Sequence, residues 1–289
     1  MQTDLFGRKR YKVNLHMHTN MSDGRKTPEE AVRLYKAQGY DAVALTDHWV
    51  YGAQREIDGV TVLPGVEYNC GGSDSKVGVF HILGICAKRE PLVNKQMCAQ
   101  ELIDSIHDAG GIAVLAHPAW SLNTPAQILP LRDVDATEIY NTVSGVQNSR
   151  RPDSSLIVDM LGAEGRFYPL IAADDTHYYN GADECRSFIM VEAESNSQED
   201  LEEAIRAGRF YASQGPEVHL KKEGDAYVAY TSPCSSIFFF SDYVWSKRAF
   251  EGEGLTEARY IPREGETFLR VEVADRDGRR AWSRILPVT

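Results

Sequence analysis

Residues 11–48 read YKVNLHMHTNMSDGRKTPEEAVRLYKAQGYDAVALTDH. Apolar and polar residues alternate over 12–18, which is the period-two pattern of a β-strand. Thr27, followed by Pro-Glu-Glu, predicts the start of a helix that ends near Gly39. The apolar run 42–46 is typical of a buried parallel strand. This stretch therefore predicts a strand–helix–strand unit.

The same alternation continues to residue 213. Because strands that alternate with helices form βαβ units, residues 1–213 are expected to form a parallel sheet or barrel of the α/β class. Further strands are expected at 60–66, 79–85, 112–116, 136–140, 169–173 and 187–192. Helices are expected at 94–109, from Pro125, at 154–161 and at 197–207.

The pattern changes after Gly215 and Pro216. From there on, short apolar runs alternate with turns rich in Gly, Pro and charge, and no helical period is present. Such a pattern is typical of a small β-sandwich. We expect residues 214–289 to form an all-β accessory domain, with strands at 218–221, 226–230, 236–240, 257–260 and 268–273.

The chain has 289 residues and a net charge of -11, with 31 Lys and Arg against 42 Asp and Glu. An acidic chain repels a polyanion at long range, which disfavours non-specific binding of duplex nucleic acid. A small phosphate ester is not excluded, because bound divalent metals reverse the local charge.

The five cysteines are odd in number and include no Cys-x-x-Cys pair. This disfavours a disulfide framework or a thiolate zinc site and favours a reducing compartment. The first ten residues lack the apolar stretch of a signal peptide, and the apolar runs are too short to span a bilayer. We therefore expect a cytoplasmic protein without a membrane span; its oligomeric state stays open.

Histidines and carboxylates recur at or beside the ends of the expected strands. In a parallel barrel, all carboxyl ends of strands lie on one face, so residues far apart in sequence converge there. Zinc, manganese and iron accept such a mixture of imidazole and carboxylate ligands. Each of these residues alone has an ordinary explanation, but together they predict a metal centre. The candidate ligands are His16, His18, Asp23, His48, Glu67, His81, His117, Asp175 and His177.

Four further polar residues are less informative. Asp47 is expected either to orient His48 or to cap a helix. Glu138 lies in an expected strand and either binds metal or shapes the pocket. His107 and His219 are expected to be structural.

The motifs resemble those of the PHP (polymerase and histidinol phosphatase) family. The similarity covers residues 11–213. The segments that carry it are His16-Met17-His18-Thr19 with Ser22-Asp23-Gly24, Leu45-Thr46-Asp47-His48, Pro64-Gly65-Val66-Glu67, His81-Ile82-Leu83-Gly84, Ala116-His117-Pro118 and Asp175-Thr176-His177.

This resemblance implies a distorted (β/α)7 TIM-like barrel that holds two or three divalent metal ions, zinc, manganese or iron. One metal position would take His16, His18, Glu67 and Asp175. A second would share Glu67 and add His81 and His117. A third would use Asp23, His48 and His177. The histidinol phosphatase branch often has His where Asp23 stands, so the aspartate disfavours histidinol phosphate as the substrate.

The function expected from these features is metal-dependent hydrolysis of a small phosphate monoester, either a nucleotide or a sugar or amino-alcohol phosphate. The metals would lower the pKa of a bound water, and the resulting hydroxide would attack phosphorus. The expected catalytic residues are Asp23, His48, Glu67, Asp175 and His177.

Substrate contacts are expected from two kinds of side chain. Arg150 and Arg151 either bind phosphate, which guanidinium groups contact bidentately, or are solvated loop charges. Trp120 and Tyr178, with Tyr140 and Tyr179, either stack on a base or pack in the wall.

Three other functions stay open. The chain could be a 5'-3' exonuclease or oligonucleotide phosphodiesterase that acts on short single strands. It could instead be a metallohydrolase of a non-phosphate ester, because the same chemistry attacks a carbonyl carbon. The last alternative is a non-catalytic metal-binding module, which the full set of ligands disfavours.

Overall fold

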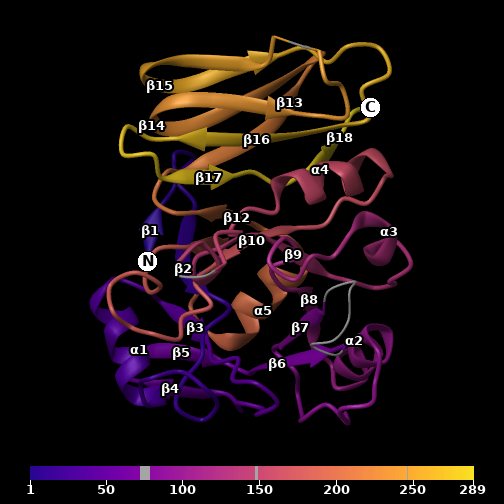
Figure 1. Cartoon of the computed structure of the whole chain (residues 1–289). Coiled ribbons are helices and arrows are strands. Elements are labelled where there is room, and N and C mark those ends of the chain that lie inside the picture. The colour runs from indigo at the N-terminus through magenta and orange to yellow at the C-terminus, as the bar shows by residue number, and fades with distance from the viewer. Residues whose placement is uncertain (72–78, 147–148, 246) are drawn as a thin grey trace.

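A computed structural model describes residues 1–71, 79–146, 149–245 and 247–289 (Figure 1). The helices are α1 (Pro28–Ala37), α2 (Ala99–Asp108), α3 (Pro125–Ile128), α4 (Ser155–Ala163) and α5 (Gln198–Arg206), with a 3-10 turn at Val143–Gly145. The strands of the first part are β1 (Gln2–Thr3), β2 (Lys9–Asn14), β3 (Ala42–Ala44), β4 (Arg55–Ile57), β5 (Val60–Leu63), β6 (Gly65–Cys70), β7 (Phe80–Ile85), β8 (Ile112–Leu115), β9 (Ala136–Asn141), β10 (Leu170–Ala173), β11 (Phe188–Glu192) and β12 (Phe210–Ser213).

The opening strand–helix–strand unit forms as predicted. Thr27 caps α1 in a capping box: its hydroxyl accepts from the Glu30 amide, and the Glu30 carboxylate accepts from the Thr27 amide. Both interactions satisfy amides that a helix start leaves unpaired. Strands β2, β3 and β5 then pair in parallel.

The remaining strands are not all parallel, so the expected parallel arrangement is wrong in this part. Strand β6 pairs antiparallel with β7, and β7 pairs antiparallel with β8. Only nine residues separate the end of β6 from the start of β7, whereas a parallel pair needs a crossover of roughly a dozen residues or more. Strands β8, β9 and β10 are parallel to one another.

The strands of the first part belong to two sheets. One has the order β10-β9-β8-β7-β6, and the other contains β12-β11-β2-β3-β5-β4. Isolated bridges join the two sheets at one end, between Met17 and Thr176 and between His48 and Glu67. Among the described residues the ladders do not close continuously, so the seven-stranded barrel stays a prediction in its detail.

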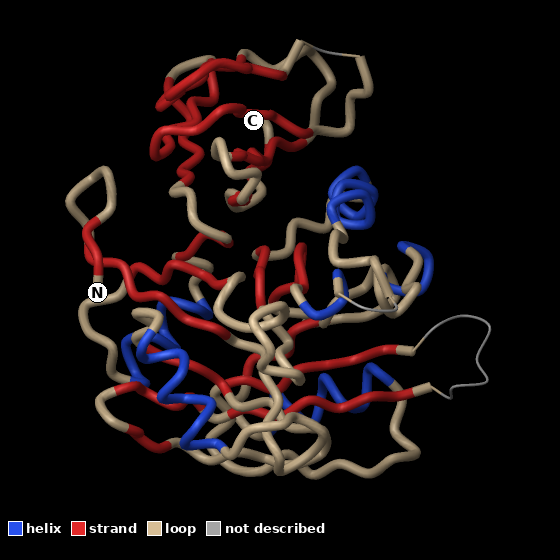
Figure 2. The backbone as a smooth tube through the Cα atoms, turned by 60° about the vertical axis from the view of Figure 1, so that its left-hand side comes forward, coloured by secondary structure: helices blue, strands red, loops and turns tan. Residues whose placement is uncertain are grey.

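The last part of the chain is all β, as predicted. Its strands are β13 (Val218–Glu223), β14 (Ala226–Phe240), β15 (Ala249–Tyr260), β16 (Phe268–Ala274), β17 (Arg280–Trp282) and β18 (Leu286–Pro287). Figure 2 shows them as a lobe at the top of the molecule. The two strands expected at 226–230 and 236–240 are one long strand with shifts of register.

This lobe continues a sheet of the first part. Strand β17 pairs antiparallel with β12, through Ala212 with Trp282 and Ser213 with Ala281. Phe268 and Trp282 are fully buried in the same apolar core as strands of the first part. An independent sandwich over 214–289 therefore stays a prediction.

No helix within the described ranges has the length and apolarity needed to cross a bilayer. The expected cytoplasmic location stays a prediction.

Candidate metal centre

The nine predicted ligands gather at the end of the strands where the two isolated bridges lie. His16 and His18 follow β2, His48 follows β3, and Glu67 and His81 belong to β6 and β7. His117 follows β8, and Asp175 and His177 follow β10. A cavity of about 320 Å³ opens above them. Seven of the nine line it: Asp23, His48, Glu67, His81, His117, Asp175 and His177.

The innermost group consists of His16, His18, Glu67 and Asp175, all of them buried. The Nε2 atom of His16 lies 3.1 Å from Oδ1 of Asp175 and 3.3 Å from Oε2 of Glu67. The Nε2 atom of His18 lies 3.0 Å from each of the same two oxygens. Two imidazoles and two carboxylates thus point at one position.

Glu67 also faces a second group. Its Oε1 atom lies 2.6 Å from Nδ1 of His81 and 3.4 Å from Nε2 of His117. Its Oε2 atom lies 3.1 Å from Nδ1 of His48. The two oxygens of one carboxylate therefore face different imidazoles, as a ligand shared between two metal positions requires.

The third group surrounds Asp23, whose side chain is about half exposed. Its oxygens lie 3.5 Å from Nε2 of His177, 3.7 Å from Nε2 of His48 and 3.6 Å from Nδ1 of His18. This group is more exposed than the innermost group.

The charges of the innermost group depend on one another. Burial lowers the pKa of His18, but the nearby carboxylates of Asp175 and Glu67 outweigh it and raise that pKa to about 9. Burial likewise lowers the pKa of His16, and Asp175 and Glu138 raise it well above its ordinary value. Burial acts to raise the pKa of Glu67, yet the neighbouring imidazoles hold it well below its usual range.

At the outer group the same rules give different results. Burial acts to raise the pKa of Asp23, but the interaction with His177 and the charges of His18 and His48 together outweigh it and lower that pKa to about 2. Burial lowers the pKa of His48 despite the charge of Glu67. A neutral imidazole is the form that binds metal.

Two buried atoms support a cation in this place. Oδ1 of Asp175 and Nδ1 of His48 are buried and form no hydrogen bond within the described protein. A buried polar atom without a partner costs free energy, so such atoms are rare unless a ligand satisfies them. Oδ1 of Asp175 faces the imidazoles of His16 and His18, and Nδ1 of His48 faces the carboxylate of Glu67. Both atoms thus lie among the candidate ligands, so the residues fit divalent metal ions.

The backbone at two ligands is strained. Asp175 has φ of +52° and His117 has φ of +25°, a region that residues other than glycine seldom adopt. Strain of this kind concentrates at functional sites.

Glu138, whose role the sequence left undecided, is fully buried and positions other residues. Its Oε1 atom lies 2.7 Å from Nδ1 of His16, and its Oε2 atom accepts from the amide of His117 at 2.8 Å. The Nδ2 atom of Asn141 donates to Glu138 at 2.9 Å and to Oδ2 of Asp175 at 3.1 Å. Glu138 and Asn141 thus hold the ligands from behind.

Among the described residues the Asp47 carboxylate makes no hydrogen bond to the imidazole of His48, so its expected role in orienting that imidazole is wrong. Its carboxylate accepts from the amide and hydroxyl of Thr19, both at 2.7 Å, and from the hydroxyl of Ser22 at 2.7 Å. Asp47 therefore organises the loop that carries Asp23.

The predicted substrate contacts fall into two classes. Trp120 and Tyr178 line the cavity, and the Trp120 ring packs edge-on against the imidazoles of His81 and His117. Arg150 and Arg151 are exposed and do not line it, so their binding to phosphate stays a prediction. One cation close to a lining residue was not expected: the guanidinium carbon of Arg25 lies 5.1 Å from the ring centre of Tyr178.

Comparison with known proteins agrees with this geometry. A PHP domain model matches residues 14–118, which include seven of the nine residues that gather here. Residues 14–118 of the chain are thus similar to a PHP domain. The ligands from His16 to His117 lie within the matched range, and Asp175 and His177 lie beyond it.

Three similar proteins complete the comparison. An uncharacterized protein of Methanocaldococcus jannaschii is 27% identical over 143 residues, which is 45% of this chain and 81% of that protein. A two-domain protein from Bacteroides vulgatus, described as containing a predicted PHP-like metal-dependent phosphoesterase, is 16% identical with a TM-score of 0.57 over 95% of this chain and 94% of its own. The lesion-specific endonuclease Q of Pyrococcus furiosus is 17% identical with a TM-score of 0.48, over 69% of this chain and 56% of its own.

The Bacteroides structure shows that the fold of this chain, including the C-terminal β lobe, occurs in another protein. At this level of identity the likeness concerns the fold alone.

Proposed function

We propose that the chain is a metal-dependent phosphoesterase that hydrolyses a small phosphate monoester, with two or three zinc, manganese or iron ions in the centre. The PHP domain supports a hydrolase that acts on phosphoester bonds. The observation that carries the proposal is the position of the Glu67 carboxylate, whose two oxygens face two groups of imidazoles. Adjacent metal positions that share a carboxylate suit hydrolysis at phosphorus.

The residues would divide into three metal positions. His16, His18, Glu67 and Asp175 would hold the first. His81 and His117 would hold the second together with Glu67, and Asp23, His48 and His177 the third. Bound divalent ions supply Lewis acidity and lower the pKa of water to near neutrality.

The protein itself contributes charge, orientation and shape. The buried carboxylates of Glu67 and Asp175 keep the centre selective for cations, because burial makes their uncompensated charge costly. Glu138 and Asn141 fix the ligands, so little reorganisation is needed during reaction. Trp120 and Tyr178 flank the cavity and would pack on the leaving group.

A small substrate is favoured over an oligonucleotide by the lining of the cavity. No lysine or arginine of the described chain is among the residues that line it. Nucleic acid is bound mainly through cationic contacts to successive phosphates, and this cavity offers none. We therefore place a mononucleotide or another small monoester ahead of an oligonucleotide.

The test is a screen of hydrolysis with one enzyme preparation. Its substrates are p-nitrophenyl phosphate, mononucleotides, sugar phosphates, a single-stranded oligonucleotide and p-nitrophenyl acetate. Phosphate release from a monoester, lost in Glu67→Gln and retained in the control His107→Gln, is the expected result. Hydrolysis of the oligonucleotide alone, or of p-nitrophenyl acetate alone, would contradict the proposed substrate class.

A further inference from the structure

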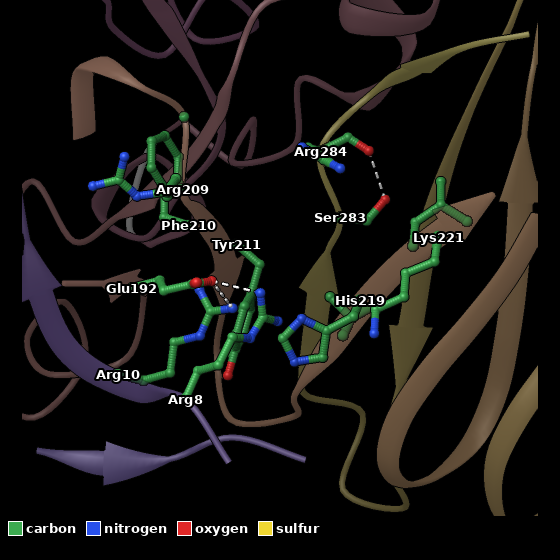
Figure 3. A pocket seen from close by; sticks show the side chains of 13 residues that line it. Arg8, Arg10, Glu192, Arg209, Phe210, Tyr211, His219, Lys221, Ser283 and Arg284 are labelled. Atoms are coloured by element: carbon green, nitrogen blue, oxygen red, sulfur yellow. Dashed lines mark hydrogen bonds and ion pairs between the residues drawn. The ribbon is translucent and has the colours of Figure 1, made fainter. Parts of the chain in front are cut away.

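A second cavity lies where the first part of the chain meets the C-terminal lobe. Its volume is about 230 Å³. Strands β2, β11 and β12 contribute to it from one side, and β13 and the segment after β17 from the other (Figure 3). It shares no lining residue with the metal centre. We call it the junction cavity.

The junction cavity is basic although the whole chain is acidic. Five of its lining residues are basic and a single one, Glu192, is acidic; the basic ones are Arg8, Arg10, Arg209, Lys221 and Arg284. A concave surface lined by one sign of charge concentrates ions of the opposite sign. Because the protein as a whole has a net charge of -11, this basic surface does not reflect a basic composition. The cavity therefore favours anions locally.

Two carboxylates hold two of the guanidinium groups in place. Oδ2 of Asp4 lies 3.0 Å from Nε of Arg8 and 2.9 Å from Nε of Arg10. Oε2 of Glu192 lies 2.7 Å from Nη1 of Arg8 and 2.9 Å from Nη2 of Arg10. A third bond joins Nη1 of Arg10 to the carbonyl of Met190. Because a guanidinium has five N–H donors, both arginines retain donors for a ligand.

The other side of the cavity carries charge that no carboxylate neutralises. Within the described ranges, neither Lys221 nor Arg284 has an acidic group within ion-pair distance, whereas Arg209 is paired with Glu203 and points away in Figure 3. The ammonium of Lys221 is held over the ring of Phe6, 3.0 Å from its centre. His219 lies beside it and pairs with Glu217 at 2.6 Å. Fixed arginines and uncompensated cations thus face the same space.

We propose that the junction cavity binds a small anion that carries a phosphoryl group. Guanidinium groups bind phosphate through paired N–H donors, and an ammonium adds a point charge. The volume lies below the roughly 300–1,000 Å³ typical of sites for drug-sized ligands, so a small ligand fits. The cavity lies beside Arg10 near the start of β2, while His16 follows the end of that strand, six residues or roughly 20 Å away. The site is therefore separate from the metal centre.

The experiment measures binding by calorimetry at constant ionic strength, with inorganic phosphate and pyrophosphate as probes. Chelator is present throughout, so that no metal recruits the probes to the catalytic centre. The test variant is Lys221→Gln/Arg284→Gln. The matched control is Lys222→Gln/Arg276→Gln, which removes the same charge from exposed positions outside the cavity.

We expect saturable one-to-one binding of at least one probe, weakened tenfold or more in the test variant and changed less than about twofold in the control. His16→Ala/His18→Ala should bind the probe as the parent does, which separates this site from the catalytic proposal. Three results would overturn it: no saturable binding, equal weakening in test and control variants, or loss of binding in the histidine variant. If the double test variant does not fold, Arg284→Gln alone gives the same comparison.

Discussion

Asn141 contacts two carboxylates of the centre without belonging to any predicted ligand set. Its Nδ2 atom donates to Glu138 and Asp175, and its Oδ1 atom accepts from the amide and hydroxyl of Ser144. We expect Asn141→Ala to weaken metal binding by about 10–100-fold, because residues behind the ligands fix their orientation. Titration of the chelated protein with zinc or manganese measures this effect.

The unfolding midpoint of the metal-free variant separates this role from a general loss of stability. If Asn141 positions the ligands, Asn141→Ala lowers the metal affinity, and the unfolding midpoint of the metal-free variant stays close to that of the metal-free parent. Unchanged affinity for every metal tested would show that Asn141 does not position the ligands.

At the scale of residues, the sequence predicts the centre well because its ligands are histidines and carboxylates placed after strands. The two roles expected for Asp47, orienting His48 or capping a helix, do not include its contacts with Thr19 and Ser22, because no sequence pattern shows that this loop returns to it. Asn141 was missed because an asparagine at the end of a strand has many ordinary roles. Glu138 was noticed but undecided, since only the fold shows that it is buried against His16.

At the scale of elements, the segment between β2 and α1 depends on a close approach at Gly24. A Cβ atom there would lie 2.4 Å from the carbonyl oxygen of His18 and 2.7 Å from the amide of Thr19. We expect Gly24→Ala to displace this segment with Asp23 and to lower the free energy of unfolding by about 1–3 kcal/mol, as overpacking does. Chemical unfolding measures the loss.

Gly52→Ala is the matched control, because its Cβ would lie at an ordinary 3.4 Å from the carbonyl oxygen of Leu45. Equal stability losses in the two variants would contradict a specific need for glycine at residue 24.

The elements themselves were largely predictable, whereas their pairing was not. Period and caps place α1 and α5 within one or two residues, since caps are local chemistry. The direction of β6 against β7 depends on the connection between them, and apolar runs look alike in parallel and antiparallel pairs. Helix α2 begins at Ala99 rather than at residue 94.

At the scale of the whole molecule, a partly buried ion pair ties the C-terminal lobe to the first part. Arg270 of β16 is fully buried, and its Nε and Nη2 atoms donate to the two oxygens of Asp159 in α4, both at 2.6 Å. We expect Arg270→Ala to lower the free energy of unfolding by about 3–5 kcal/mol, because removal of one partner leaves a carboxylate unpaired.

Arg259→Ala, an exposed arginine of the same lobe with ion pairs near 4.0 Å, is the control and should cost less than about 1 kcal/mol. A similar loss in both variants would show that the Arg270 pair does not couple the two parts. No sequence pattern predicts this pair, since its partners lie 111 positions apart.

The central claim is that the gathered histidines and carboxylates form a catalytic metal centre. The most direct test measures metal content and phosphate release on one purified sample, beside His16→Ala/His18→Ala and the control His107→Ala. We expect two or three bound metals, and phosphate release that chelator and the double variant abolish and the control retains. Phosphate release that persists undiminished in the double variant, or no bound metal after reconstitution, would contradict it.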